Sequence, residues 1–385
     1  MNKRLFLLLA LIMVLGLGGL FTLNTYVASG EAQVQAEEAQ LPEPKEEPKE
    51  IHMVAMGDFM LHQPQLDAAK TPEGYDFSDI FTHLGPYIGE ADLAAINLET
   101  TLTDGSQGYT SFPVFSSPKE VAGEFKRQGI DLVATANNHC YDKGLKGLDY
   151  TLDQLEEEGL VAFGTSQGEE NLPVIYEIEG IKLGLASYTY GLNGFDASLA
   201  ASERPQAVNL IDREKIQADV DQLKDQGADL VLLYLHWGVE YQSQASEDQE
   251  ALALELFDMG VDGILGSHPH VAQRVEKHVL GDKTHYVAYS MGNFVSNQRR
   301  EYIGGNPRVE SGLMMDMTIK KDPEGQVEIT KFEPQVLWVD KFQDQEGLHY
   351  QVIPVKAALE GDIDLPRLDQ VRDRLVQAQE NFDAL

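Results

Sequence analysis

This sequence is poor in cysteine and in positive charge. Cys140 is the only cysteine in 385 residues, so no disulfide can form within the chain. Lys and Arg number 29 against 63 Asp and Glu, which gives a formal net charge of −34. A general basic surface for nucleic acid is therefore excluded, because such a surface needs positive charge to displace counterions from phosphates. Broad electrostatic attachment to anionic lipid is excluded for the same reason.

The first 50 residues divide into an apolar run and an acidic segment. Lys3 and Arg4 precede an apolar run over 5–23, which is long enough to cross a bilayer as a helix at about 1.5 Å per residue. We interpret residues 1–29 as a signal anchor or a signal peptide. An anchor would place the protein in the cell membrane, single-pass with its C-terminal domain extracellular, and cleavage would secrete it. Residues 30–50 contain many Glu and three Pro and are expected to be a disordered linker.

Beyond residue 50, short apolar runs alternate with amphipathic helical patterns. This alternation predicts an α/β fold with a mainly parallel sheet, in which ligands bind beyond the carboxyl ends of the strands. The strands are expected at 51–58, 93–97, 131–136, 230–235 and 261–265, and the helices at 118–128, 144–158, 212–226 and 247–259.

The remaining patterns suggest a second sheet and a C-terminal extension. Residues 172–188 form two alternating runs around Glu179-Gly180, which is a hairpin signal, and Pro323-Glu324-Gly325 marks another turn. Two sheets, each covered by helices on one face, would account for both. We assign 51–340 to one domain and 341–385 to an extension, with an amphipathic helix expected over 368–382.

Carboxylate, amide and imidazole groups follow five of the predicted strands. Each alone is weak evidence, since a single Asp after a strand is usually a helix cap. Together they suit a divalent transition metal, one or two ions of Mn, Fe or Zn. In the extended His268-Pro269-His270 the two imidazoles point the same way, so each can reach one of two neighbouring ions. The candidates are Asp58, Glu99, Asn138, His139, His236, His268 and His270.

These residues lie in stretches that resemble a known family. GDFML, INLETTLT, FSSPKEVA, ATANNHCYDKGLKGLDYTLDQL, YLHWGVEY, GSHPHVAQRVE and YSMGNFVSNQ are together similar to the CapA family of capsule or poly-γ-glutamate biosynthesis proteins, relatives of the calcineurin-like metallophosphatases. The resemblance covers about residues 51–300. It implies a four-layer α/β/β/α sandwich of the metallo-dependent phosphatase type, with a metal centre at the sheet ends. It also implies work on an anionic polymer such as poly-γ-glutamate, beside membrane ligase and export subunits.

The resemblance also implies roles for individual residues. Six would be metal ligands: Asp58 and His270 for one ion, Asn138, His236 and His268 for a second, and Glu99 between the two. His139 matches the general acid that protonates the leaving oxygen.

Met60 departs from the phosphatase pattern. That pattern begins Asp-x-His, and Met60 stands where the histidine belongs. A thioether is a poor ligand for Mn or Fe, so the first ion loses a ligand. His62 is a candidate replacement, against the ordinary interpretation of a structural histidine. Two hypotheses therefore stay open: a metal-dependent hydrolase, and a non-catalytic accessory subunit that binds metal and polymer.

A few further residues are candidates for substrate binding or structure. Asn293 either lines the site or forms a turn. Arg299 and Arg300, with Arg308 nearby, form the one local basic cluster, which either binds carboxylates bidentately or belongs to a solvated loop. Cys140 has no neighbouring base and is interpreted as a small buried filler.

Overall fold

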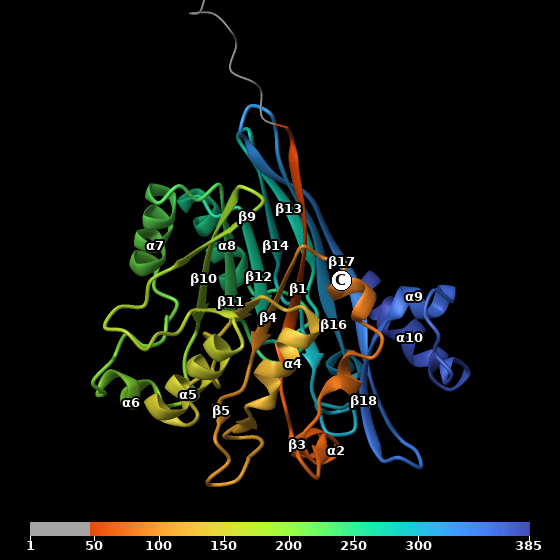
Figure 1. Cartoon of the computed structure of the whole chain (residues 1–385). Coiled ribbons are helices and arrows are strands. Elements are labelled where there is room, and N and C mark those ends of the chain that lie inside the picture. The colour runs from red at the N-terminus through yellow and green to blue at the C-terminus, as the bar shows by residue number, and fades with distance from the viewer. Residues whose placement is uncertain (1–46) are drawn as a thin grey trace, which may run out of the picture. The chain divides into compact units, whose positions relative to one another are not determined.

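Two β-sheets stack face to face in the computed structural model, which describes residues 47–385 (Figure 1). The first sheet has eight strands, with β1, β4, β7 and β8 parallel to one another and β16, β17 and β18 antiparallel at one side. Its members are β18 (Leu348–Pro354), β17 (Val327–Gln343), β16 (Ser311–Lys321), β1 (Lys49–Phe59), β4 (Leu93–Leu98), β7 (Leu132–Ala134) and β8 (Val161–Phe163), with β15 (Asn293–Val295) paired to the end of β1.

The second sheet has six strands with a parallel centre and antiparallel edges. The predicted hairpin is confirmed as its edge pair, and both turn residues, Glu179 and Gly180, have the positive φ that a two-residue hairpin turn requires. In spatial order the strands are β13 (Val275–Leu280), β14 (Lys283–Ala288), β12 (Gly263–Ser267), β11 (Leu230–His236), β10 (Ile181–Thr189) and β9 (Val174–Ile178).

Helices cover the outer face of each sheet, except that the last two join the same core as the inner face of the first sheet, and the connections carry short elements. The helices are α2 (Gln63–Ala68), α3 (Gly85–Gly89), α4 (Glu120–Gln128), α5 (Gly144–Glu157), α6 (Asp196–Ala200), α7 (Arg213–Asp225), α8 (Glu247–Met259), α9 (Val355–Glu360) and α10 (Leu368–Asp383). The short elements are β2 (Lys70–Thr71), β3 (Gly74–Tyr75), β5 (Leu102–Thr103), β6 (Ser117–Pro118), η2 (Ser78–Phe81) and η3 (Pro307–Glu310).

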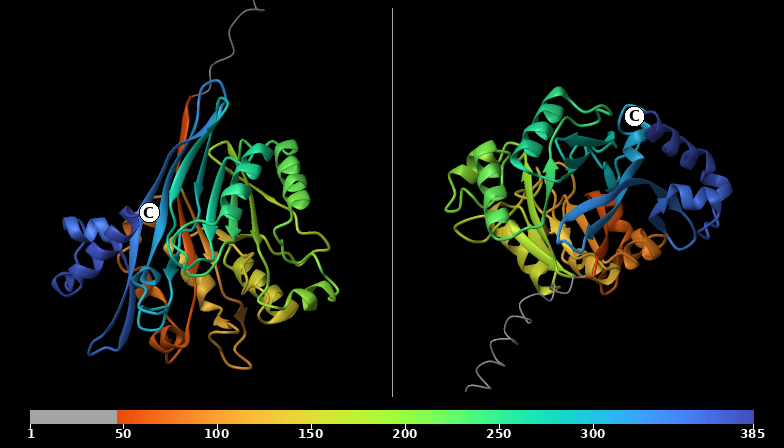
Figure 2. Two further views of the ribbon diagram at one scale, coloured as in Figure 1. Left: turned by 180° about the vertical axis from the view of Figure 1, so that it is seen from behind. Right: turned by 90° about the horizontal axis from the view of Figure 1, so that it is seen from above.

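The side chains of β1 show how the layers are held together. Met53 and Ala55 belong to the core between the two sheets, whereas Val54 and Met56 belong to the core under α3 and α4. A third core joins the second sheet to α7 and α8. Both faces of the central strands are therefore buried, which explains their continuous apolar sequences. The predicted α/β/β/α order of layers is confirmed, and Figure 2 shows it from above.

The C-terminal residues complete the first sheet. β17 and β18 extend it past the second sheet, and α9 and α10 pack on β17, where Val371 and Leu375 join the core. α10 covers the segment in which a helix was expected.

The expected placement in the cell membrane was wrong on the residues that can be described. None of the helices in 47–385 has both the length and the apolar character needed to span a bilayer. The apolar run over 5–23, on which that expectation depended, lies outside the described residues, as does most of the predicted linker over 30–50.

Gly57 allows the close approach that places Asp58. A Cβ at residue 57 would lie 2.1 Å from the carbonyl oxygen of Gly292, which accepts the backbone N–H of Asp58 at 2.9 Å. We expect Gly57→Ala to lower the free energy of unfolding by about 1–3 kcal/mol, because two backbones must separate. Gly89→Ala, at a position with nothing within 4 Å, is the matched control. Denaturant unfolding measures both, and equal stability of the two variants would contradict this account.

Candidate metal centre

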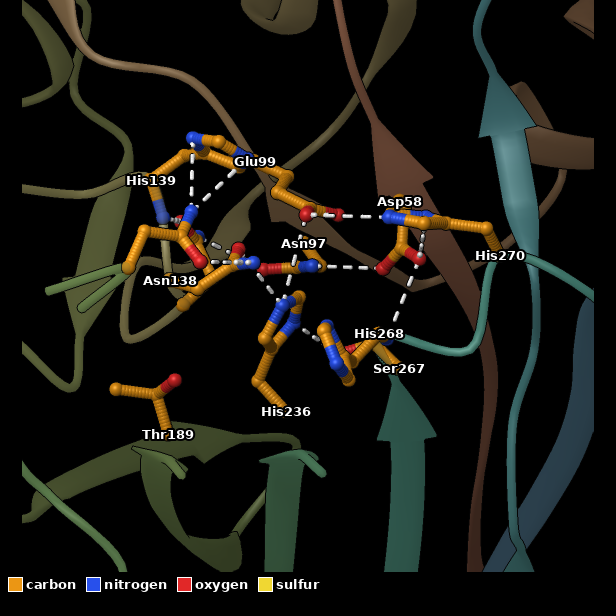
Figure 3. A network of polar contacts seen from close by, with 12 residues as sticks. Asp58, Asn97, Glu99, Asn138, His139, Thr189, His236, Ser267, His268 and His270 are labelled. Carbon is orange, nitrogen blue, oxygen red and sulfur yellow. Dashed lines mark hydrogen bonds and ion pairs between the residues drawn. The ribbon is translucent and has the colours of Figure 1, made fainter. Parts of the chain in front are cut away.

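All seven strand-end candidates lie together at the carboxyl ends of the parallel strands (Figure 3). Asp58, Glu99 and the Asn138-His139 pair follow β1, β4 and β7 of the first sheet. His236 ends β11 of the second sheet, and His268 and His270 follow β12. The site is therefore built across the interface of the two sheets, as the rule for parallel strands predicts.

Asp58 links the two sheets directly. Its Oδ1 accepts the Asn97 amide at 2.8 Å, within the first sheet. Its Oδ2 lies 3.1 Å from Nδ1 of His270 and accepts the backbone N–H of His268 at 3.3 Å, both from the second sheet. Asn137 in turn donates to Oδ1 of Asn97 at 3.2 Å. The carboxylate is thus oriented from both sides.

Glu99 is a fully buried carboxyl group, and neither of its oxygens has a hydrogen-bond partner among residues 47–385. Its neighbours are imidazole nitrogens, Nε2 of His236 at 3.5 Å and Nε2 of His270 at 3.7 Å. Burial and then the charge of Asp58 raise the pKa of Glu99 well above its usual value. An unsatisfied buried carboxylate is costly, so this arrangement fits a cation between the carboxylate and the imidazoles.

His236 is held in a fixed orientation and kept neutral. Its Nδ1 lies 2.9 Å from Oγ of Ser267, and its Nε2 lies 3.0 Å from Oδ1 of Asn138. Burial, followed by the nearby His268, lowers the pKa of His236 well below its usual value. A neutral imidazole offers the lone pair that a metal needs, and a partner on the other nitrogen fixes the ring.

His268 has the features of a ligand without a partner. Its Nδ1 is buried and has no hydrogen bond among residues 47–385. Burial, then the nearby His270, lowers its pKa to about 3. His268 and His270 both have positive φ, of 95° and 57°, which is rare outside glycine and typical of strained functional sites. Tyr190 packs on the His268 ring at an interplanar angle of 44°, with centroids 4.4 Å apart.

These groups match what a transition metal requires. Asp58, Glu99 and His270 offer ligand atoms that all lie within 4.8 Å of one another. Carboxylate and neutral imidazole together suit Mn, Fe and Zn.

His139 lies beside this cluster and is paired with a carboxylate. Its Nδ1 is 2.8 Å from Oδ2 of Asp142, which also accepts the backbone N–H of Phe115 at 2.6 Å. The ring packs edge to face on Phe115, with centroids 4.6 Å apart. Asp142 therefore holds the Nδ1 proton and leaves Nε2 as the exchangeable position.

Sequence reasoning missed several residues that position the site. Asp142 lies three residues after His139, and that spacing was the available signal. Asn97 lies in the quoted INLE stretch. Asn137 and Ser267 directly precede the candidates Asn138 and His268 in two other quoted stretches. Only Tyr190 and Asn193 come from a separate segment with no pattern that points to the site.

Asn293 lies next to Asp58, as its strand partner on β15. It is fully buried, and its amide donates to the backbone oxygens of His270 at 3.2 Å and Val309 at 2.9 Å. These hydrogen bonds hold the loop that carries His270 in place. Substrate binding by Asn293 stays a prediction.

The arginine cluster does not join the site. Arg300 donates to Glu310 at 2.5 Å, and Arg299 lies 3.4 Å from the same buried carboxylate. Arg299 also donates to the carbonyl oxygen of Val339 at 2.7 Å, and Arg308 donates to the carbonyl oxygen of Asn381. These guanidinium groups hold the fold together. Their charge is already paired or directed into the fold, so the geometry does not favour the substrate-binding prediction for Arg299 and Arg300.

The remaining candidates are buried beside the site. Met60 is buried, with its backbone N–H bonded to Val295. His62 packs against Phe115 at 5.2 Å between centroids and accepts the backbone N–H of Asn297 on Nδ1, and burial lowers its pKa to about 4. Burial raises the pKa of the Cys140 thiol to about 12, which agrees with a filler role.

With this geometry in view, the comparisons identify the family. The family described as bacterial capsule synthesis protein PGA_cap matches residues 52–298. This chain belongs to that family. Within it, the capsule biosynthesis protein CapA of Bacillus anthracis is 29% identical over 275 residues, covering 69% of this chain. The match spans 64% of that relative, just under two thirds of its length. The PGA biosynthesis protein CapA of Bacillus subtilis is 26% identical over 72% of this chain and 70% of its own.

Solved structures with lower sequence identity to this chain are also similar to it. The calcineurin-like phosphoesterase YfkN of Bacillus subtilis is 13% identical, with a TM-score of 0.45 over 86% of this chain and 100% of the other. The NAD nucleotidase of Haemophilus influenzae is also 13% identical with a TM-score of 0.45, over 88% of this chain and 63% of the other.

The buried histidines make the metal-free stability depend on pH. Below about pH 6.5 the unfolded chain binds protons on His62, His236 and His268 that the folded chain does not. The free energy of unfolding therefore decreases as the pH is lowered. Each such proton contributes at most about 1.4 kcal/mol per pH unit. Glu99, with its raised pKa, acts in the opposite sense but as one group against three.

We therefore expect chelated protein to be less stable to denaturant at pH 5 than at pH 7. His268→Gln should make this dependence shallower. Equal stability at the two pH values, or an unchanged slope in the variant, would contradict this interpretation.

Proposed function

We propose that this chain takes part in producing a capsule polymer of the poly-γ-glutamate type, and that its strand-end cluster is a metal-dependent hydrolase-type site. The family match and the names of its Bacillus relatives support the pathway. Glu99 carries the proposal for the site, because its buried carboxylate faces imidazoles and has no hydrogen-bond donor among residues 47–385.

The residues divide between two metal positions. We infer one or two ions of Mn, Fe or Zn, with ligands from both sheets. Asp58 and His270 would hold the first, Asn138, His236 and His268 the second, and Glu99 would lie between them. When bound, such ions polarise the bond to be cleaved and lower the pKa of water.

His139 is the residue that moves a proton. Asp142 fixes its ring through Nδ1, so Nε2 can give a proton to the leaving group. Phe115 and the side chain of Asn137, whose Oδ1 accepts the backbone N–H of His139, hold this pair in place, and Asn193 lies near the ring at 3.3 Å from Nε2. The pair resembles a general acid with its orienting carboxylate.

The alternative is an accessory subunit that binds metal and polymer without catalysis. Met60 favours it, since a buried thioether stands where a histidine ligand is expected. In both cases the chain would act with the ligase and export subunits that make and move the polymer.

An anionic polymer must be attracted locally, because the chain itself is strongly acidic. A cavity of about 290 Å³ supplies a local site. Lys143 and Lys146 line it together with Asp104, Ser116 and Tyr150, so two positive charges face one negative charge. The cavity lies next to the His139–Asp142 pair along the chain, because Lys143 follows Asp142 and Ser116 follows Phe115, whose backbone N–H bonds to Asp142. We propose that carboxylates of the polymer bind there.

Two variants separate the functions. His139→Asn should lower hydrolysis of a phosphoester or γ-glutamyl peptide by about 10²–10⁴-fold while keeping its metal. His236→Ala should lose metal. In a strain deleted for the gene, the wild-type chain should restore surface polymer and His236→Ala should not.

Polymer output from His139→Asn decides between the two candidates. Loss of polymer supports the hydrolase, and normal polymer supports the accessory subunit. His278→Asn on β13 is the control. Normal polymer from both site variants would sink both proposals.

The cavity has its own test. Lys143→Ala with Lys146→Ala should weaken binding of poly-γ-glutamate at least tenfold at low salt, with a smaller effect at high salt. Lys126→Ala, an exposed lysine on α4, is the control. Equal binding by the double variant and the control would show that the cavity does not bind the polymer.

A further inference from the structure

The loop between β11 and α8 is fixed by hydrogen bonds against the loop that carries His268 and His270, called the histidine loop here. The N–H of Tyr241 donates to the carbonyl oxygen of Pro269 at 2.8 Å, between the two histidines. Gln273 donates to the backbone oxygens of Gln242 at 2.9 Å and Gln244 at 3.1 Å. Glu240 therefore has a defined place beside His268 and His270, although its side chain is exposed.

Glu240 is near enough to bind a metal ion beside these histidines. Its carboxylate, His268 and His270 offer ligand atoms that all lie within 4.8 Å of one another. Ligand atoms sit about 2.0–2.2 Å from a transition metal, so a small side-chain rotation would bring the Glu240 carboxylate onto the ion that His270 holds.

The histidine loop provides independent evidence of a ligand. Nδ1 of His268 is buried without a hydrogen bond among residues 47–385, although a buried ring nitrogen normally has a partner. The positive φ values of His268 and His270 show that the backbone is strained to present these two rings.

Met60 leaves the proposed metal site one ligand short, and Glu240 can supply that ligand. Residue 60 is a buried methionine, so β1 supplies Asp58 but no imidazole two residues later. A carboxylate from the loop after β11 would restore the number of ligands from the opposite side. Its oxygen is a harder ligand than sulfur and suits Mn or Fe better.

We propose that Glu240 is a metal ligand beside His268 and His270, at the ion that His270 holds, in place of the ligand that Met60 does not provide. This inference rests on the metal site of the proposed function. It adds a residue from a loop that neither the strand-end pattern nor the family resemblance had assigned.

Metal binding by the full chain tests the proposal without any enzyme assay. The chelated protein is titrated with Mn²⁺, followed by calorimetry and by the electron paramagnetic resonance signal of free Mn²⁺. We expect Glu240→Gln to weaken binding at least tenfold or to remove one bound ion, and Glu240→Asp to have a smaller effect. Glu169→Gln, another exposed glutamate, should bind as the wild type does. The metal-free variants should unfold at the same denaturant concentration as the wild type, because both side chains are exposed.

The outcomes separate this proposal from the function on which it rests. If Glu240→Gln binds Mn²⁺ like the wild type while Asp58→Asn does not, Glu240 is not a ligand and the metal site stands. If Glu169→Gln weakens binding as much as Glu240→Gln, the effect is one of general charge and the proposal is wrong. If the wild type binds no Mn²⁺, Zn²⁺ or Fe²⁺, both the ligand and the proposed metal site fail.

Discussion

The buried carboxylate of Glu99 is the constraint on which the rest of the site depends. Taking a carboxylate out of water without a hydrogen-bond donor costs several kcal/mol, by the usual order of magnitude. The chain surrounds this group with imidazoles that burial keeps neutral, and it satisfies Asp58 with amides. Such an environment is unfavourable for the empty carboxylate and favourable for a bound cation. The stacked sheets, the strained histidine loop and the bracing asparagines all serve to maintain it.

The sequence contained enough to predict the layers and the position of the site. Continuous apolar strands alternating with amphipathic helices specify buried parallel sheets, and the carboxyl ends of such strands meet at one edge. That geometry brings Asp58 and His270 together although 212 residues separate them. No family knowledge is needed for this step, only the period of the strands and the polar residues that end them.

What sequence could not supply was the partner of each polar group. The arginines at 299 and 300 looked like a free basic cluster, but Glu310, ten residues after Arg300, is buried between them and takes up their charge. Asp142 stands three residues after His139, but the sequence did not show that its carboxylate pairs with the ring. Glu240 was overlooked because its loop has no strand or helix pattern, and only the hydrogen bonds to Pro269 and Gln273 place it.

The candidate ligands come from two separate parts of the chain, and this has a consequence for how the molecule assembles. Residues 58–139 supply one half of the cluster and residues 236–270 the other, each from its own sheet. Contacts between segments so far apart form late in folding, after the cost of closing a long loop has been met. In the proposed arrangement each ion takes ligands from both halves. Occupancy of the centre would therefore report that the two sheets have docked, and a bound ion would slow their separation.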